Sequence, residues 1–155
     1  RSPKPGAFTA QVLIVPRILA GRSVRLVGDI DQPHAWTAPV DVARALLVAA
    51  ADPRGHGRAW HVPSNPPRTQ RQAVADLARA AGVATPRTGT VSPLLLAAAG
   101  LVVPMLRELR ETDYQRQRPY LLDDRAARSV LGLDETPWED LVAAQVAAYR
   151  EFVPA

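Results

Sequence analysis

The chain has 155 residues, 47% of them hydrophobic and 22% charged, with a net charge of +4. One compact domain is expected, because a chain of this length buries roughly 70% of its unfolded surface. The balance of apolar and charged residues is that of a globular protein rather than of a disordered or membrane protein. The sequence contains no cysteine, which excludes disulfides, thiolate metal sites and a cysteine nucleophile.

Lysine is almost absent from the sequence. Lys4 is the only one, and it lies between Pro3 and Pro5 close to the first residue. This position fits neither a phosphate-binding P-loop, nor a buried Schiff-base lysine, nor the Tyr-x-x-x-Lys pair of an oxidoreductase. These three chemistries are therefore excluded for this chain acting alone.

The first part of the chain predicts helices that alternate with short strands. Apolar residues at mixed three- and four-residue spacings predict a helix over 8–20, with an irregularity at Pro16. Two short β-type runs, 24–27 and 34–37, are separated by a turn and predict a hairpin. A helix follows from Asp41, which we expect to be its cap.

The middle of the chain contains the clearest helix start. Ala59 to Val62 is expected to be a strand that ends at a proline-rich loop, 63–67. Thr69 and Gln72 then have the spacing of a capping box, in which each side chain binds a backbone N–H of the other. The helix that they open ends at Gly82.

The last part predicts one further strand and three helices around an irregular stretch. We expect the strand at 88–91, helices at 93–108, 124–131 and 137–152, and the irregular stretch at 111–119. Asp123 or Asp124 is expected to cap the short helix that ends before Gly132, and Thr136 to cap the last helix. Strands alternating with helices predict the α/β class.

The most apolar stretch runs from Leu94 to Leu106 and includes Pro104. A membrane-spanning helix needs about 20 residues, so this segment is interpreted as a buried helix. The first residues do not have the pattern of a signal peptide. A soluble, cytoplasmic protein without a membrane partner is expected.

Few residues have the spacing of a catalytic or metal site. The histidines are His34, His56 and His61, and none has a carboxylate at the helical spacing of a metal ligand. The acidic pair Asp123 and Asp124 stands at a helix start, where capping explains it. No catalytic residue and no metal ligand is therefore predicted.

DNA binding is an alternative interpretation of one segment. Residues 73–94 resemble a helix-turn-helix of lactose-repressor type, and the sequence is basic. The stretch after Gly82 is too long for that motif, however, and it places Pro86 and Gly89 where the recognition helix should begin. A net charge of +4 on 155 residues also gives only a weak electrostatic attraction for the phosphates of DNA. Nucleic acid is therefore a disfavoured partner.

Four stretches, taken in order, resemble the C-terminal, substrate-binding half of extended short-chain dehydrogenase/reductases, the NAD-dependent epimerase/dehydratase family. They are Gly21–Asp29, Val40–Ala45, Gly57–Val62 with Thr69 after it, and Leu122–Leu133 with Thr136–Trp138 after it. The resemblance covers nearly the whole chain.

The resemblance implies a particular fold for residues 1–155. They would form a single substrate-binding lobe of the α/β class, mostly helical with a small mixed sheet. Ala59–Val62 would be a strand belonging to the sheet of a nucleotide-binding domain that is absent from this chain. The implied partner is therefore an N-terminal nucleotide-binding half, or a second copy in a dimer that covers the same surface.

The resemblance also implies an activity and a substrate surface. The dinucleotide fingerprint and the catalytic Tyr-x-x-x-Lys belong to the other half, so NAD or NADP is implied as cofactor without being bound by this chain alone. The Arg-Asp pair of nucleotide-sugar members corresponds to His34-Ala35 here, which favours a small substrate that is not a nucleotide sugar. The predicted substrate-binding residues are His34, Trp36, Tyr114, Arg116 and Arg118.

The predicted function is thus substrate binding in an NAD(P)-dependent epimerase, dehydratase or reductase that is not competent without its other half. A non-catalytic binding or scaffold protein derived from that family is the first alternative, and the helix-turn-helix DNA-binding module is the second.

Overall fold

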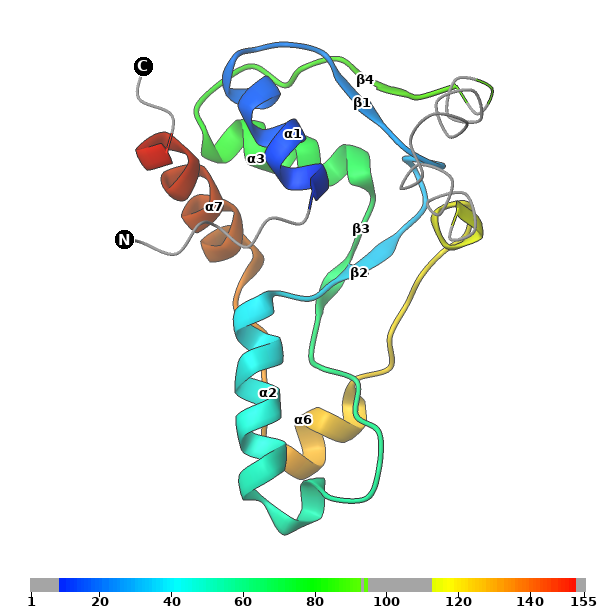
Figure 1. Cartoon of the computed structure of the whole chain (residues 1–155), viewed down its shortest axis with the longest axis vertical. Coiled ribbons are helices and arrows are strands. Elements are labelled where there is room, and N and C mark those ends of the chain that lie inside the picture. The colour runs from blue at the N-terminus through cyan, green and yellow to red at the C-terminus, as the bar shows by residue number, and fades with distance from the viewer. Residues whose placement is uncertain (1–8, 93, 95–112, 153–155) are drawn as a thin grey trace.

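The computed structural model describes residues 9–92, 94 and 113–152, and the helix predicted over 93–108 lies almost entirely outside them. The described chain is elongated, with helices gathered at two ends (Figure 1). The upper end holds α1 (Thr9–Leu19), α3 (Gln70–Ala80) and α7 (Trp138–Phe152). The lower end holds α2 (Pro39–Ala51), the 3-10 helix η1 (Pro53–Gly55) and α6 (Arg125–Leu131).

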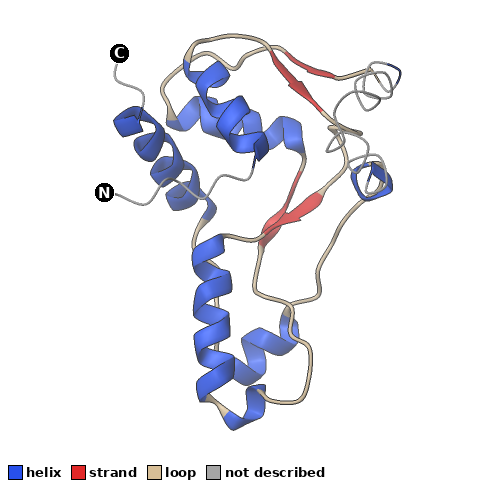
Figure 2. Cartoon of the chain, in the orientation of Figure 1, coloured by secondary structure: helices blue, strands red, loops and turns tan. Residues whose placement is uncertain are grey.

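Four short strands in the described residues form two separate pairs instead of one mixed sheet (Figure 2). They are β1 (Val24–Leu26), β2 (His34–Trp36), β3 (Asn65–Arg68) and β4 (Thr88–Thr90). β1 pairs with β4 in parallel, and β2 pairs with β3 antiparallel. The predicted hairpin between 24–27 and 34–37 is therefore wrong, because each of these strands pairs with a segment far along the chain. The α/β class itself is confirmed.

The strand predicted at Ala59–Val62 is also wrong. Those residues belong to no strand, and β3 forms instead at Asn65–Arg68, inside the stretch predicted as a loop. Pro66 and Pro67 lack the backbone N–H that a central strand requires. Both are exposed in a two-stranded sheet, where a free edge tolerates proline.

Local signals at helix ends are confirmed where they depend on the backbone next to them. The Thr69 hydroxyl accepts from the Gln72 N–H at 3.1 Å, and the Gln72 side chain accepts from the Thr69 N–H at 2.8 Å, which is the predicted capping box. Gly132 ends α6 with a φ of 63°, a left-handed conformation that glycine adopts without strain.

Of the predicted caps, Asp123 does act at the start of α6, where its carboxylate accepts from the Arg125 N–H at 3.2 Å. The other predicted caps have different roles. α2 starts at Pro39 after Ala38, so Asp41 lies inside its first turn and not at its cap. The Asp41 carboxylate accepts from the Thr136 N–H at 2.9 Å and from its hydroxyl at 2.6 Å, so Thr136 joins α2 rather than capping α7. Asp124 stands at the cap position of α6, but its side chain accepts from the Ser64 N–H instead.

The buried apolar side chains of the described chain form two clusters. The upper cluster lies among α1, α3, α7 and β1, and includes Ile18, Val74, Trp138 and Tyr149. The lower cluster lies between α2 and α6 and consists of Ala45, Ala127, Leu131 and Leu133, with Trp60 among the partly buried residues packed against it.

Candidate functional site

The segment that carries most of the predicted substrate-binding residues lies against β2. It begins with the 3-10 helix η2 (Asp113–Arg116) and continues to Tyr120. The Ala35 N–H donates to the Tyr120 carbonyl at 2.7 Å, and the Tyr120 N–H donates to the Pro33 carbonyl at 3.0 Å. These two bonds hold the segment beside β2 through a parallel bridge at His34.

The ring of His34 fixes η2 in place. Its Nε2 lies 3.0 Å from the Gln115 carbonyl oxygen, and its Nδ1 lies 3.1 Å from the Gln32 carbonyl oxygen. A neutral imidazole carries one N–H, so it donates to one of these two oxygens at a time. Both ring nitrogens face the backbone, and His34 therefore orients the segment rather than presenting a nitrogen to a ligand.

Gly28 has a role in this arrangement that the sequence analysis missed. Its φ is 84°, and a Cβ at this position would lie 2.4 Å from the Cβ of Arg116. The neighbouring Asp29 N–H donates to the Arg116 carbonyl at 3.1 Å. Only glycine permits this approach. The pair Gly28-Asp29, which follows β1 closely, is the only local signal of this approach, and it does not indicate which distant segment comes near.

The structure therefore brings four of the five predicted substrate-binding residues to one surface. Tyr114 is 65% exposed, Arg118 is exposed and Arg116 is half-buried, all on the segment that His34 contacts. A phenol and guanidinium groups on one short segment offer hydrogen-bond donors to the polar part of a ligand. We refer to His34 and residues 113–120 as the η2 surface.

Trp36, the fifth predicted residue, lies away from the η2 surface. Its indole N–H donates to the Arg68 carbonyl at 2.9 Å, and its ring meets that of Trp138 edge to face with centroids 6.0 Å apart. The Arg68 guanidinium lies 4.9 Å from the Trp138 ring centroid, on the ring face. Trp36 thus belongs to the packing between β2 and α7.

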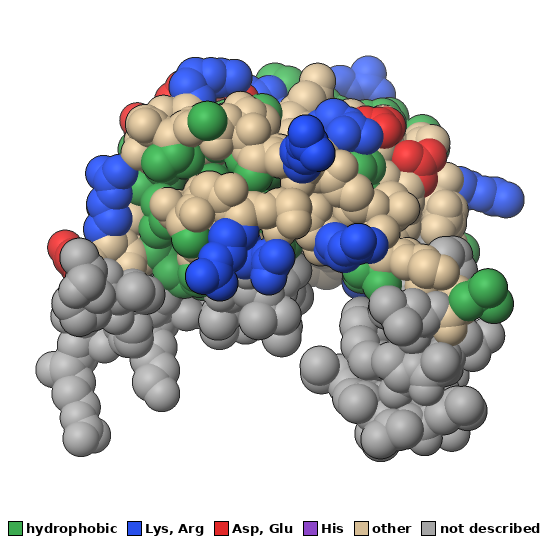
Figure 3. Space-filling view, turned by 90° about the horizontal axis from the view of Figure 1, so that it is seen from above, with side chains coloured by type: hydrophobic (Ala, Val, Ile, Leu, Met, Phe, Trp, Pro, Cys, Tyr) green, Lys and Arg blue, Asp and Glu red, His purple; other side chains and the backbone are tan. Residues whose placement is uncertain are grey.

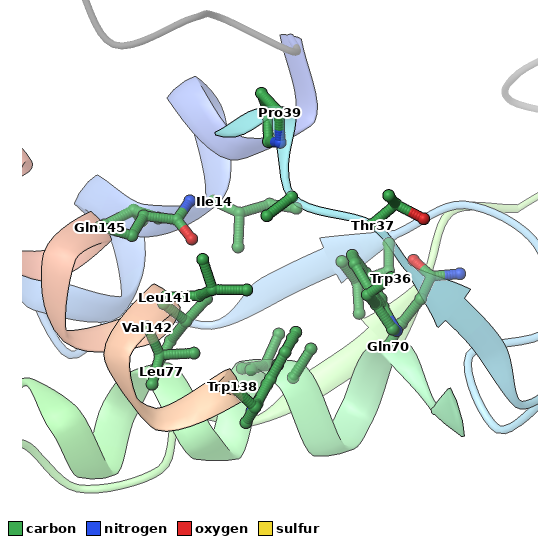
Figure 4. A pocket seen from close by; sticks show the side chains of 15 residues that line it. Ile14, Trp36, Thr37, Pro39, Gln70, Leu77, Trp138, Leu141, Val142 and Gln145 are labelled. Atoms are coloured by element: carbon green, nitrogen blue, oxygen red, sulfur yellow. The ribbon is translucent and has the colours of Figure 1, made fainter. Parts of the chain in front are cut away.

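Trp36 lines an apolar cavity of about 330 Å³ that the sequence analysis did not predict. Figure 4 shows this cavity between α1, α3, α7 and the link from β2 to α2. None of its lining residues is charged. No local sequence pattern indicates it, because its walls come from five segments spread over more than a hundred residues of the chain.

A shallow cleft lies at the lower end, around the segment predicted as a strand. Arg58, Trp60 and His61 form one side, and Asp123 and Arg125 form the other. The Arg58 guanidinium stacks 4.1 Å from the Trp60 ring centroid. The His61 Nδ1 lies 2.9 Å from the Asp123 carbonyl oxygen, which joins the two sides.

The carboxylates at the lower end are held in their charged form by arginines. The hydrogen bond from Arg125 lowers the pKa of Asp123 to about 2, and that from Arg54 does the same for Asp52. Burial alone would raise the pKa of Asp124, but hydrogen bonds from Arg128 and from the Ser64 N–H outweigh it and lower that pKa. These groups act as ion-pair partners, and not as proton donors near neutral pH.

Neither a metal cluster nor a membrane span is found in the described part of the chain. It contains no group of three or more histidine, aspartate or glutamate side chains placed to hold a metal ion. None of its helices has the length and apolar character to cross a bilayer.

Comparison of the whole chain with protein-family models finds no match, and comparison with curated proteins finds none of significant similarity.

Proposed function

We propose that the chain is the substrate-binding lobe of an NAD(P)-dependent epimerase, dehydratase or reductase, and that it works with a nucleotide-binding half. The order of its four sequence stretches suggests this family. The observation that carries the proposal is α2, a helix that is apolar on both sides.

One face of α2 is covered by the rest of the chain and the other is not. Ala45 is buried against the lower cluster. Val40, Leu46 and Leu47 are 52%, 67% and 74% exposed, so a second apolar face of the same helix meets water. Large apolar side chains gathered on an exposed face are typical of an interaction surface. A partner that covers α2 accounts for this composition.

The position of the exposed α2 face at the lower end supports a nucleotide-binding half as the partner. Residues 59–62, which the resemblance assigns to the sheet of the nucleotide-binding half, lie at the same end of the molecule. Trp60 and Val62 pack with Val48 and Ala49 against the lower cluster. Residues 59–62 pair with no strand in the described part of the chain, and the Val62 carbonyl accepts from the Ser64 hydroxyl at 3.1 Å. We propose that this segment adds to a sheet edge supplied by another domain. The two features together favour a nucleotide-binding half at the lower end.

The η2 surface is the proposed substrate site. It provides Tyr114, Arg116 and Arg118, held in place by His34 and by the close approach at Gly28. Without the Arg-Asp pair of nucleotide-sugar enzymes, this surface fits a smaller or more apolar substrate. Hydride transfer would belong to the other half, because no residue of this chain matches the catalytic pair of the family.

A non-catalytic scaffold of the same ancestry would use the same α2 face and remains the first alternative. The DNA-binding alternative gains no support from the fold, because strand β4 follows α3 where a recognition helix would be needed. Arginines are scattered over the upper end instead of forming one patch (Figure 3). A DNA mobility-shift assay at low salt separates this alternative, and salt-sensitive binding would favour it.

The partner surface is tested by sedimentation velocity of the chain alone at micromolar concentration. We expect self-association through α2, which Leu47→Asp reduces and Leu121→Asp does not. Leu121 is the matched control because it is 58% exposed but lies next to the η2 surface. A well-behaved monomer of the unmodified chain contradicts the proposal that a partner must cover the exposed α2 face.

The enzymatic part is tested on the complete reading frame. A Gly-x-x-Gly-x-x-Gly turn and a Tyr-x-x-x-Lys pair are expected upstream in the same or an adjacent polypeptide, and their absence favours the scaffold. In the completed protein, Tyr114→Phe and Arg116→Ala should raise KM for the substrate while nicotinamide binding is unchanged. Unchanged substrate affinity in both variants removes the η2 surface as the site.

A further inference from the structure

We propose that the apolar cavity between α1, α3 and α7 is a second binding site, for a small neutral molecule whose apolar ring carries one carbonyl oxygen. This site does not depend on the proposed function. It is separate from the η2 surface, whose described residues do not line the cavity.

The cavity has the size and construction of a small-molecule site. Its volume of about 330 Å³ lies within the range of roughly 300 to 1,000 Å³ found for ligand pockets. Its walls are fixed by side chains that are themselves buried, among them Val74 (3% exposed), Val142 (6%) and Trp138 (8%). A cavity with rigid apolar walls is complementary to an apolar group of fixed shape.

One polar atom on the wall has no partner. The Nε2 amide of Gln145, on α7, is buried and makes no hydrogen bond within the described part of the chain. Figure 4 shows the amide end of Gln145 beside Ile14 on the wall of the cavity. A buried donor without an acceptor is destabilising, and a ligand oxygen at this point would satisfy it.

The other polar groups of the wall are already engaged. The indole N–H of Trp36 donates to the Arg68 carbonyl, and that of Trp138 donates to Asp76 at 2.8 Å. The Gln70 amide donates to the Val27 carbonyl at 3.0 Å, and the Thr37 hydroxyl lies 2.6 Å from that of Ser64. The Gln145 Nε2 is therefore the polar atom of the wall that favours an acceptor on the ligand.

The ligand must also be uncharged. No charged residue lines the cavity, and burying an unpaired charge among these apolar side chains is strongly unfavourable. The faces and edges of Trp36 and Trp138 favour a ring as the apolar part. A ring ketone satisfies all of these conditions.

The experiment uses two probes that differ in one atom group. Cyclohexyl methyl ketone carries the proposed acceptor, and 2-cyclohexylpropene replaces its C=O with C=CH2. The three tryptophan indole N–H signals of the ¹⁵N-labelled chain are followed during titration with each probe. Trp36 and Trp138 line the cavity, whereas Trp60 is at the lower end and serves as an internal control.

We expect the ketone to shift the Trp36 and Trp138 signals and to leave Trp60 unchanged. The ketone should bind about three- to tenfold more tightly than the alkene, which corresponds to one net hydrogen bond of about 0.5 to 1.5 kcal/mol. In Gln145→Leu the two probes should bind equally. In Ala73→Leu, which fills the cavity from α3, both should lose binding.

Three outcomes overturn the proposal. They are an absence of shifts at Trp36 and Trp138, equal shifts at all three tryptophans, and equal affinity of ketone and alkene for the unmodified chain. The last comparison needs no variant, so the test does not depend on the folding of Gln145→Leu. Failure of this site leaves the η2 surface and the α2 face unaffected.

Discussion

The two ends of the molecule are stabilised by different interactions. The upper end buries large aliphatic and aromatic side chains from three helices, including Ile18, Val74 and Tyr149. The lower end buries two alanines and two leucines, and its polar contacts centre on Arg128. That guanidinium pairs with Asp124 at 3.0 Å, with Asp134 at 3.2 Å and with Glu135, and it also donates to the Ser64 carbonyl.

This difference shows what each kind of interaction provides. Apolar burial gives most of the free energy of folding, whereas an ion-pair network at a partly exposed site mainly fixes geometry. The lower end therefore holds its shape with little core of its own, and it leaves one face of α2 uncovered. We interpret it as a part of the protein whose burial is completed by a partner.

The largest expected effect is the loss of stability when a buried side chain is shortened, and it should be greater in the upper cluster than in the lower one. Ile18→Ala, at a residue 1% exposed, should lower the free energy of unfolding by about 4 kcal/mol because it leaves a cavity among three helices. Leu131→Ala in the lower cluster should cost about 2 kcal/mol, at the low end for such substitutions, because fewer groups surround it. Urea denaturation measures both values. Equal losses would show that the lower cluster is as well packed as the upper one.

The next effect concerns the hydrogen bonds between Asp41 and Thr136, which connect the two ends of the molecule. Asp41 is 2% exposed, and Asp41→Ala should cost about 3 kcal/mol because it removes the acceptor for both Thr136 donors and the partner of Arg44 at 3.1 Å. Thr136→Val, which removes only the hydroxyl, should cost about 1 kcal/mol. Thermal unfolding followed by circular dichroism compares the two variants. Similar losses of stability in the two variants would mean that the bond from the Thr136 hydroxyl accounts for the whole contribution of Asp41.

A smaller effect is expected at the capping box of the upper end. Thr69→Ala should lower stability by about 1 kcal/mol, because the Gln72 N–H loses its acceptor at the start of α3. Thr69→Ser keeps the hydroxyl that accepts from the Gln72 N–H and is the control for the substitution itself. Urea midpoints of the two variants give the comparison, and an unchanged midpoint for Thr69→Ala contradicts a stabilising role for the cap.

The smallest effect is a pH dependence that should appear first at the lower end. The pKa values of Asp52 and Asp123 are about 2 in the folded protein, below the ordinary 3.8, because of Arg54 and Arg125. Their contribution to stability is therefore present above about pH 4 and is lost as the pH falls toward 2. The indole signal of Trp60 should change in this range before those of Trp36 and Trp138. Simultaneous change of all three would mean that the ends unfold together.

The sequence predicted features that depend on neighbouring residues, and it failed where distant segments meet. The Thr69–Gln72 box and the Gly132 helix end follow from the conformations of a few adjacent residues, so both were predictable. The pairings of β1 with β4 and of β2 with β3 join segments about 30 to 60 residues apart, and strands of three or four residues carry too little pattern to select a partner. The proximity of Gly28 to Arg116 and the walls of the cavity are non-local for the same reason.

The candidate site was predictable in part. Irregular polar segments on a rigid scaffold often bind ligands, and this general rule identified Tyr114, Arg116 and Arg118. The rule does not say which way a strand residue turns, and so Trp36 was assigned to the same surface as His34. The structure instead pairs its ring with Trp138, and no pattern within β2 distinguishes these two outcomes.

The two bonds between Asp41 and Thr136 join residues 95 positions apart. They tie the first turn of α2 to Thr136, which lies two positions before Trp138, the first residue of α7. A domain that docks on α2 and tilts it must either break this link or drag α7 with it. A displacement of α2 at the lower end is therefore transmitted through these two hydrogen bonds to α7 at the upper end.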